Sequence, residues 1–315
     1  MWTKQGLIFT VEGDREWNRS HAQCPVVDDG RPDIWRIYYA SRDERGWSRA
    51  SFIDVAAGEP KKILYVHDRP IMDLGELGAF DDTGVMPACV ITHEGRKFLY
   101  YVGWTTRVTV PYSNATGLAE SFDGGLTFAR LGGGPVIPPI LQEPYFTGTA
   151  HVLKSGGRWQ MWYLSCTGWH RFHDQTAPRY HIKYAESADA INWERNGTVA
   201  LDYSNAEEGG IASVSVIKGA GTYRAWYCFR GIAGFRTDRT QTYRIGYAES
   251  QDGIAWTRRD DRAGIGLSDT GWDSEMIAYP SVVKHAGTYF MFYNGNGFGE
   301  TGFGYATASE AAIER

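Results

Sequence analysis

The chain has 315 residues, and its 32 Lys and Arg residues against 37 Asp and Glu residues give a formal net charge of −5. Because the basic residues are scattered, we expect neither nucleic acid nor an anionic membrane as a partner. No apolar stretch approaches the roughly 18 residues that a membrane-spanning helix needs. The opening Met-Trp-Thr-Lys also lacks the features of a secretion signal, so we expect a cytoplasmic protein.

An aromatic strand recurs five times along the chain, and each copy is preceded by an apolar run. The copies occupy residues 35–39, 98–101, 159–163, 223–227 and 289–293. Their final tyrosines lie 62, 62, 64 and 66 residues apart. This spacing suits a repeated unit of four strands with long loops.

A strand of small residues and a turn follow each of the middle aromatic strands. Residues 118–124, 184–190 and 247–253 share the letters Ala-Glu-Ser followed by an Asp two positions later. Two of these segments end in Asp-Gly, which is typical of a hairpin turn. An aromatic residue then opens a fourth strand, at Phe128, Trp193 and Trp256.

The last repeat lacks a fourth strand, because the sequence ends at Arg315 soon after residues 304–310. Residues 2–8 match residues 193–199 in character, so the N-terminal strand can complete the last unit. Closure of this kind covers an exposed sheet edge. We therefore predict an all-β fold, a five-bladed β-propeller formed by residues 1–315 as one domain.

Acidic residues recur where the first strands of the predicted blades enter the central channel. Counting back 20 positions from the final tyrosine gives Asp81 beside Asp82, Glu143, Glu207 beside Glu208, and Asp273 two residues before Glu275. The first repeat has no acid there and offers His21 and Gln23 instead. Carboxylates crowded near aromatic residues titrate apart, as acid/base chemistry on a glycosidic bond requires. Solubility and turn formation are the alternative explanation for acids at loop entries.

Aromatic and polar residues cluster at the same level of the predicted channel. Sugar rings have apolar faces and hydroxyl edges, so this mixture suits a carbohydrate ligand. The candidate substrate-binding residues are His21, Gln23, Asp81, Trp104, His151, Trp169, Arg230, Asp273, Tyr279 and Asn294. Packing between sheets is the alternative role for any one aromatic residue, and a buried hydrogen-bonded role is the alternative for the two histidines. We expect no metal site and no cofactor.

Several segments resemble the five-bladed propeller glycoside hydrolases, a superfamily that includes arabinanases, β-xylosidases, invertases, levansucrases and mannoside phosphorylases. The segments are residues 248–256, 289–293, 17–25, 80–87 and 271–276, and the last three are similar to a bacterial branch encoded among surface-polysaccharide genes. The resemblance implies a base or nucleophile on the first blade, a pKa-tuning Asp on the second and an acid Glu on the third. Asp82 matches the Asp that the resemblance implies on the second blade, and Glu143 matches, more loosely, the acid Glu implied on the third. The first-blade Asp is missing.

These observations lead to one main hypothesis and two alternatives. The main hypothesis is glycosidase-type cleavage, with Glu143 as general acid, Asp82 tuning it, and Glu208 or Glu275 activating water or acting as nucleophile. The substrate would be a carbohydrate or a nucleotide-linked sugar. The alternatives are a glycosyltransferase or sugar-modifying enzyme of surface-polysaccharide biosynthesis, and a non-catalytic sugar-binding propeller. The sequence leaves the oligomeric state open.

Overall fold

A computed structural model describes residues 1–172, 175–236 and 238–314, which form strands almost throughout. The strands are β1 (Thr3–Phe9), β2 (Ser20–Asp28), β3 (Ile34–Arg42), β4 (Ser48–Ala56), β5 (Glu59–Val66), β6 (Gly84–His93), β7 (Arg96–Thr106), β8 (Tyr112–Ser121), β9 (Ala129–Arg130), β10 (Thr147–Ser155), β11 (Arg158–Phe172), β12 (Gln175–Ser187), β13 (Val199–Leu201), β14 (Glu208–Lys218), β15 (Tyr223–Gly231), β16 (Arg244–Ser250), β17 (Thr257–Arg258), β18 (Ala278–His285), β19 (Thr288–Asn294) and β20 (Phe303–Ser309). The helices are single turns: a 3₁₀ turn (Asp260–Arg262), α1 (Asn296–Gly299) and α2 (Glu310–Ile313). Within the described ranges, no helix has the length and apolar character needed to cross a lipid bilayer.

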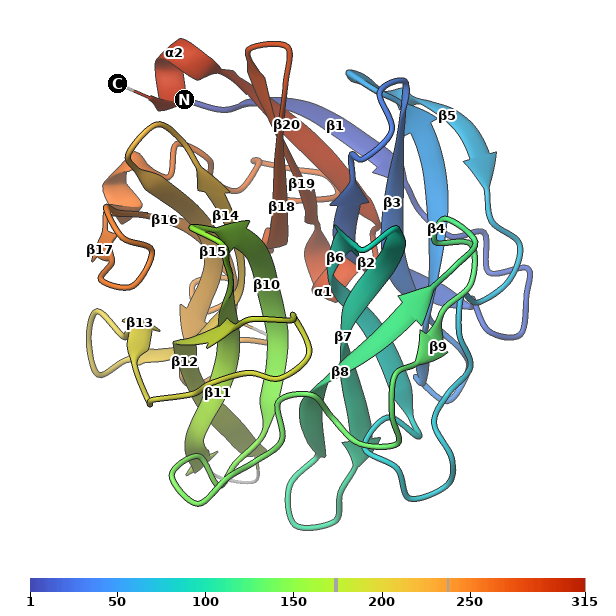
Figure 1. The fold of residues 1–315 in the computed structure, drawn as a ribbon, viewed down its shortest axis with the longest axis vertical. Helices are drawn as coiled ribbons and strands as arrows, with labels where there is room; N and C mark the ends of the chain where they lie inside the picture. Colours follow the sequence, from blue (N-terminus) through green and yellow to red (C-terminus); the bar gives the residue numbers. More distant parts are fainter. Residues whose placement is uncertain (173–174, 237, 315) are drawn as a thin grey trace.

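The pairing of these strands gives five antiparallel groups of four. In order from the inner strand outward they are β2-β3-β4-β5, β6-β7-β8-β9, β10-β11-β12-β13, β14-β15-β16-β17 and β18-β19-β20-β1. Figure 1 shows the groups arranged around a centre, with the first strands inside and the fourth strands outside. We interpret each group as one blade. The predicted β-propeller fold is confirmed, whereas one domain over residues 1–315 stays a prediction.

The N-terminal strand closes the ring. β1 pairs antiparallel with β20 over five residue pairs, from Thr3 opposite Thr307 to Phe9 opposite Phe303. The two chain ends lie close together in Figure 1. The prediction that the N-terminal strand completes the last blade is therefore confirmed.

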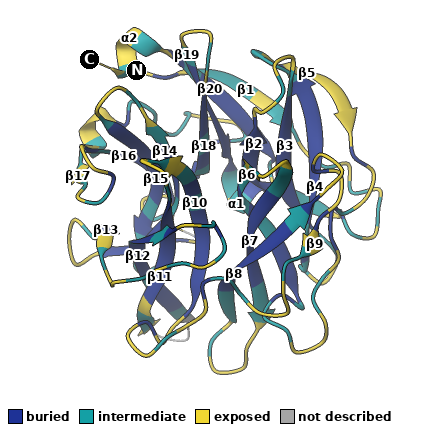
Figure 2. Cartoon of the chain, in the orientation of Figure 1, coloured by how far each residue is buried: buried dark blue, intermediate teal, exposed yellow. Residues whose placement is uncertain are grey.

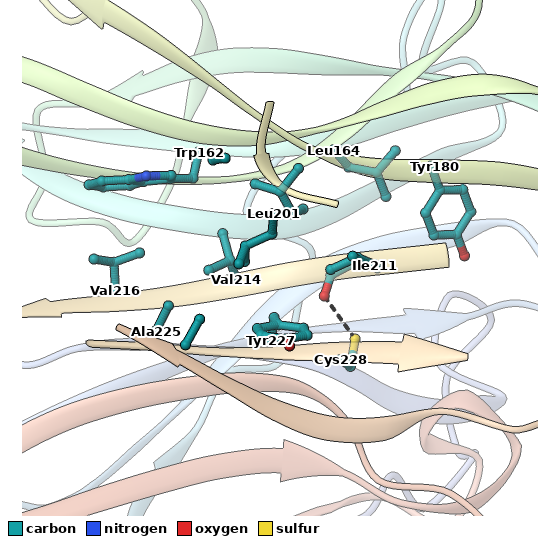
Figure 3. Packing of buried hydrophobic residues seen from close by; sticks show 14 of the residues in the cluster. Trp162, Leu164, Tyr180, Leu201, Ile211, Val214, Val216, Ala225, Tyr227 and Cys228 are labelled. Carbon is teal, nitrogen blue, oxygen red and sulfur yellow. Dashed lines mark hydrogen bonds between the residues drawn. The ribbon is translucent and has the colours of Figure 1, made fainter. Parts of the chain in front are cut away.

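Apolar side chains fill the spaces between neighbouring blades. Figure 3 shows one such interface, where Trp162 and Leu164 of β11 face Ile211, Val214 and Val216 of β14. The central strands are buried and the connecting loops exposed, as the colours of Figure 2 show. At about 25 cal/mol per Å² of apolar surface, these aromatic interfaces supply the main driving force for the fold. This explains why the sequence repeats an aromatic strand in every blade.

Each first strand carries a β-bulge in its first half or near its middle. The register shifts within the pairings of β2, β6, β10, β14 and β18 with their second strands. Three of the bulged strands hold a non-glycine residue at positive φ: Cys24 at 55°, Ser213 at 47° and Tyr279 at 56°. A bulge turns a side chain away from its regular direction, and positive φ costs energy for a residue with a Cβ. These bulges thus determine which side chains face the centre of the ring.

Candidate ligand-binding site

A buried carboxylate that precedes the first strand links the second and fourth strands of a blade, and the second blade shows the arrangement most simply. Asp81 is 1% exposed, and its Oδ2 accepts hydrogen bonds from the Tyr101 hydroxyl at 2.9 Å and from Arg130 Nε at 2.8 Å. Tyr101 is the final tyrosine of the second strand, and Arg130 lies on the fourth. The nearby charge adds to burial in raising the pKa of Tyr101 above its usual range. We call this arrangement a carboxylate staple.

The third blade holds a staple built on Glu143. Both carboxylate oxygens accept from the Tyr163 hydroxyl at 3.1 Å, and the Ser165 hydroxyl donates at 3.2 Å. Lys183 Nζ lies 3.3 Å from Oε1, and Arg195 Nη1 lies 3.7 Å from Oε2. Glu143 is thus held between two cations and two hydroxyls, with only 3% of its surface exposed.

The fifth and fourth blades follow the same plan with one variation. Asp273 accepts from the Tyr293 hydroxyl at 2.9 Å and from Lys4 Nζ at 2.6 Å. Glu208 accepts from both terminal nitrogens of Arg258, at 2.7 and 2.9 Å. In the fourth blade, the hydroxyl of the second-strand tyrosine, Tyr227, donates to Asp260 and not to Glu208. Asp260 accepts in turn from the same Arg258.

The first blade is the exception. Its final tyrosine is Tyr39, whose buried hydroxyl donates to no carboxylate among the described residues. The acid missing from the sequence at this level is therefore missing from the structure as well. Four blades carry a staple and one does not.

The other two candidate catalytic acids have different surroundings. Asp82 is half-buried, and its Oδ2 accepts from the Gly78 backbone N–H at 3.0 Å. Its Oδ1 is buried without a hydrogen-bond partner in the described part of the chain. Glu275 is exposed. Among the described residues, no group of three or more His, Cys, Asp and Glu residues is arranged to hold a metal ion.

A cavity of about 230 Å³ opens at the end of the ring where the second strands finish. Three predicted substrate-binding residues line it: Gln23, Trp104 and Tyr279. Its other aromatic lining residues are Tyr112, Phe146, Tyr180, Phe235, Tyr243 and Phe298, and its other polar ones are Arg42, Asn114, Thr149 and Arg236. The described lining contains no Asp or Glu. The cavity is therefore aromatic and cationic.

Two arginines reach the cavity without a carboxylate partner. Arg42 is half-buried and donates from Nη2 to Gln23 Oε1 at 3.0 Å. Arg236 is exposed at the rim and lies over Phe235 and Phe298, with its guanidinium carbon 4.9 and 5.2 Å from the ring centres. Neither forms an ion pair with any described residue. Burial, the largest effect, lowers the pKa of Arg42.

A third arginine, Arg230, lies behind the cavity wall. It is 1% exposed, and its guanidinium carbon lies 3.7 Å from the ring centre of Phe235. It donates to the Tyr180 hydroxyl at 2.9 Å and to the carbonyl oxygen of Pro178 at 2.7 Å. Burial lowers its pKa, but the surrounding tyrosines raise it by more, so the net shift is upward. Arg230 thus fixes Tyr180 from behind.

Tyrosine hydroxyls converge on this cavity. The hydroxyls of Tyr180 and Tyr243 are hydrogen bonded to each other. Burial, with neighbouring tyrosines, raises the pKa of Tyr112, Tyr243 and Tyr279 above its usual range. These hydroxyls are therefore protonated at neutral pH and can donate hydrogen bonds.

Two predicted histidines lie near but outside this lining. His151 faces a second cavity, of about 320 Å³, that the first strands of all five groups enclose and that Tyr279 also lines. Burial lowers the pKa of His151 to about 4. His21 is hydrogen bonded to the Ser20 hydroxyl at 2.8 Å, and burial followed by the charge of Arg42 lowers its pKa to about 4. Both histidines are neutral at pH 7.

Two further predicted residues support the site from outside. Trp169 packs edge-on against Tyr112, with ring centres 5.3 Å apart. Asn294 is fully buried, and its Oδ1 accepts from the Cys24 backbone N–H at 3.1 Å. The structure thus brings Gln23, Trp104 and Tyr279 together at one cavity, whereas it places the other predicted residues behind it, beside it or in staples.

Sequence reasoning missed several cavity residues, although the repeat contains a signal for them. Asn114, Tyr180 and Tyr243 each lie four residues before the Leu or Tyr that opens the Ala-Glu-Ser segment. Arg42 lies three residues after the final tyrosine of its strand, as do Trp104 and Arg230. Aligning all repeats at these two positions would have identified them.

Comparison with known proteins places the chain in a family. No family model matches the sequence. Two proteins from Mycobacterium tuberculosis strains, the uncharacterised proteins MT1551 and Rv1502, are each 38% identical over 309 residues, covering 97% of this chain and 98% of theirs. This chain belongs to their family.

Solved structures of glycoside hydrolases share its fold. One comes from the GH130 family of mannoside phosphorylases, with a TM-score of 0.72, 13% identity and coverage of 99% of this chain and 94% of that one. A thermostable family-43 glycoside hydrolase has a TM-score of 0.63, 15% identity and coverage of 91% and 88%. The Bombyx mori GH32 β-fructofuranosidase BmSUC1, in complex with sucrose, has a TM-score of 0.59, 15% identity and coverage of 92% and 61%. The chain therefore has the fold of the β-propeller glycoside hydrolases.

Proposed function

We propose that this protein is carbohydrate-active and that it binds a saccharide in the aromatic cavity at the end of the ring. The observation that carries the proposal is the lining itself, which combines Trp104 and several phenol rings with amide and guanidinium donors. Apolar faces of a sugar can stack on the aromatic rings while its hydroxyls bond to the polar groups. The fold shared with glycoside hydrolases, one of them solved with sucrose, supports the same class of ligand.

The reaction is a separate question. Cleavage of a glycosidic bond by the usual route needs two carboxyl groups, about 5 to 9.5 Å apart, on either side of the bond. Glu143 and Glu208 are each held by cations in staples, and neither lines the cavity. We therefore favour saccharide binding over hydrolysis by those two carboxylates.

The surroundings of Asp82 favour hydrolysis, which is therefore the second candidate function. Its buried Oδ1 lacks a hydrogen-bond partner within the described residues, so one oxygen is available for a proton or a water. It lies two residues before Gly84, which pairs with Trp104 of the cavity wall. Neither Asp82 nor Glu275 lines the cavity, so in this version the bond would be cleaved beside it, with Asp82 as the acid or base and Glu275, the exposed one of the four candidate catalytic acids, in the second role.

The experiment is a screen of purified protein against mono- and oligosaccharides, aryl glycosides and nucleotide sugars. Binding is read by calorimetry and product release by mass spectrometry. Trp104→Ala should abolish binding, whereas Phe122→Ala, at an aromatic residue that is 77% exposed and outside the cavity lining, should not. Release of sugar that Asp82→Asn abolishes would establish the hydrolase. Binding without turnover would support a sugar-binding protein or a transferase, and a lack of binding across the panel would refute the proposal.

A further inference from the structure

Arg42, which faces the cavity, differs from Arg36 and Arg258 in having no carboxylate partner. Arg36 is 4% exposed and bonds both oxygens of Asp54, at 2.8 and 2.9 Å. Arg258 bonds both oxygens of Glu208 in the same way. Arg42 has instead only the neutral side-chain oxygen of Gln23, although it is half-buried. Removing a guanidinium from water without a counter-charge is costly, so its retention at a cavity requires an explanation.

The surroundings of Arg42 keep the cavity positive. No described lining residue is acidic, and Arg236 adds a second positive charge at the rim. The acidic side chain whose charge acts on Arg42 is Glu300, which is exposed and forms no ion pair with it among the described residues. His21, beside Arg42, is neutral at pH 7 and adds no charge of its own. The field at the cavity therefore favours an anion.

The neutral groups of the lining suit an oxyanion as well. The hydroxyls of Tyr112 and Tyr279 are protonated, and no described residue accepts a hydrogen bond from either. A carboxylate or phosphoryl group accepts several hydrogen bonds at once, and those from a guanidinium are about twice as strong as neutral ones. A volume of about 230 Å³ is below the roughly 300 to 1,000 Å³ of drug-sized ligand pockets, so one sugar unit fits better than an oligosaccharide.

Resting on the proposed saccharide-binding function, we infer that the sugar carries its own negative charge, a carboxylate or a phosphoryl group, and that Arg42 and Arg236 bind it. The aromatic walls hold the ring of the sugar. Arg230 acts indirectly, because it fixes Tyr180 and does not line the cavity. Uronic acids and glycosyl phosphates are the two classes of sugar that fit such a pocket. Both carry an oxyanion, and they differ in its charge and in its position on the sugar.

The test compares matched ligands on the intact protein by calorimetry: glucose, glucuronate, glucose 1-phosphate and inorganic phosphate. Each charged sugar that binds should do so at least tenfold more tightly than glucose, and its affinity should fall with added salt. Arg42→Gln should weaken charged-sugar binding about 10- to 100-fold, which corresponds to one charge-assisted hydrogen bond. The affinity for glucose should fall by less than the affinity for either charged sugar. Glucuronate and glucose 1-phosphate distinguish the two sources of the oxyanion.

The matched control is Arg45→Gln, since Arg45 is an exposed arginine that lies over Trp47 and outside the cavity lining. Arg45→Gln should bind each of the four ligands with the same affinity as the unaltered protein. Equal affinity for glucose and both charged sugars, or no effect of Arg42→Gln in a variant with unchanged thermal unfolding, would overturn the inference and leave saccharide binding intact. Inorganic phosphate that binds as tightly as glucose 1-phosphate would also overturn it, because the sugar would then contribute nothing. If no sugar binds, neutral or charged, the proposed function itself is refuted.

Discussion

Neutralising Glu143 should destabilise the whole protein, because the carboxylate holds two cations and two hydroxyls in a nearly water-free place. Glu143→Gln keeps the shape and the bond from Tyr163, but it leaves Lys183 and Arg195 without their counter-charge. Removing one partner of a buried ion pair costs about 3 to 5 kcal/mol, and the retained hydrogen bond places this change near 3 kcal/mol. For 315 residues, at about 2.1 cal/mol/K each, the unfolding entropy is about 0.66 kcal/mol/K. The melting temperature should therefore fall by about 4 to 5 °C.

The assay is thermal unfolding by calorimetry or circular dichroism at pH 7, checked by urea denaturation. The matched control is Glu275→Gln, at an exposed position, which should change the free energy of unfolding by less than about 0.5 kcal/mol. A double variant that also neutralises Lys183 should lose less stability than the two single changes added together. Unchanged or higher stability in Glu143→Gln would refute the staple and restore the general-acid hypothesis, since catalytic groups are commonly held at a cost in stability.

Three further predictions follow from the same geometry. Gly84→Ala should weaken saccharide binding by displacing Trp104, because a Cβ at this glycine would lie 1.6 Å from the indole nitrogen; calorimetry against the unaltered protein checks this. Lys4→Met should cost about 3 kcal/mol by leaving Asp273 buried without its cation, and urea denaturation should show part of that loss restored by Asp273→Asn. Stability should fall as the pH drops from about 6.5 towards 4, because the pKa of His151 is lowered to about 4 and the unfolded chain binds the proton more readily. Thermal unfolding against pH should show a smaller decline in His151→Gln, and identical slopes would contradict this.

The repeat, and the closure of the ring by the N-terminal strand, could be predicted from the sequence because both produce local patterns of residues. The final tyrosines at nearly constant spacing mark the second strands, and the likeness of residues 2–8 to 193–199 pointed to the pairing of β1 with β20. The positions of the acids were also predictable, by counting 20 residues back from the final tyrosine of each second strand. In the fourth blade, however, the count reached the exposed Glu207, whereas the adjacent Glu208 is the buried one.

The cation partners of Asp81 and Glu208 were harder to predict, because each lies on a fourth strand about 50 residues further along the chain, and Lys4, the partner of Asp273, lies at the other end of the chain. Arg130 follows Asp81 by 49 residues and Arg258 follows Glu208 by 50. Each cation lies two residues after an aromatic residue that opens a fourth strand, in the pattern Phe128-Ala-Arg and Trp256-Thr-Arg. The pattern was visible, but only the pairing of the fourth strand with the third gives it an electrostatic meaning.

The repeat also separates the residues that hold the fold from those that form the site. A position that keeps its chemistry in four blades, such as the acid of the staple, has a partner that repeats with it, and the pair does the same structural task each time. The position three residues after the final tyrosine behaves in the opposite way, since it holds Arg42, Trp104, Cys166, Arg230 and Asn296 in turn. Packing between equivalent blades cannot require five different side chains at equivalent places. Because two of these residues line the cavity and Arg230 supports its wall, we infer that selection for a ligand, rather than for the propeller, produced the differences.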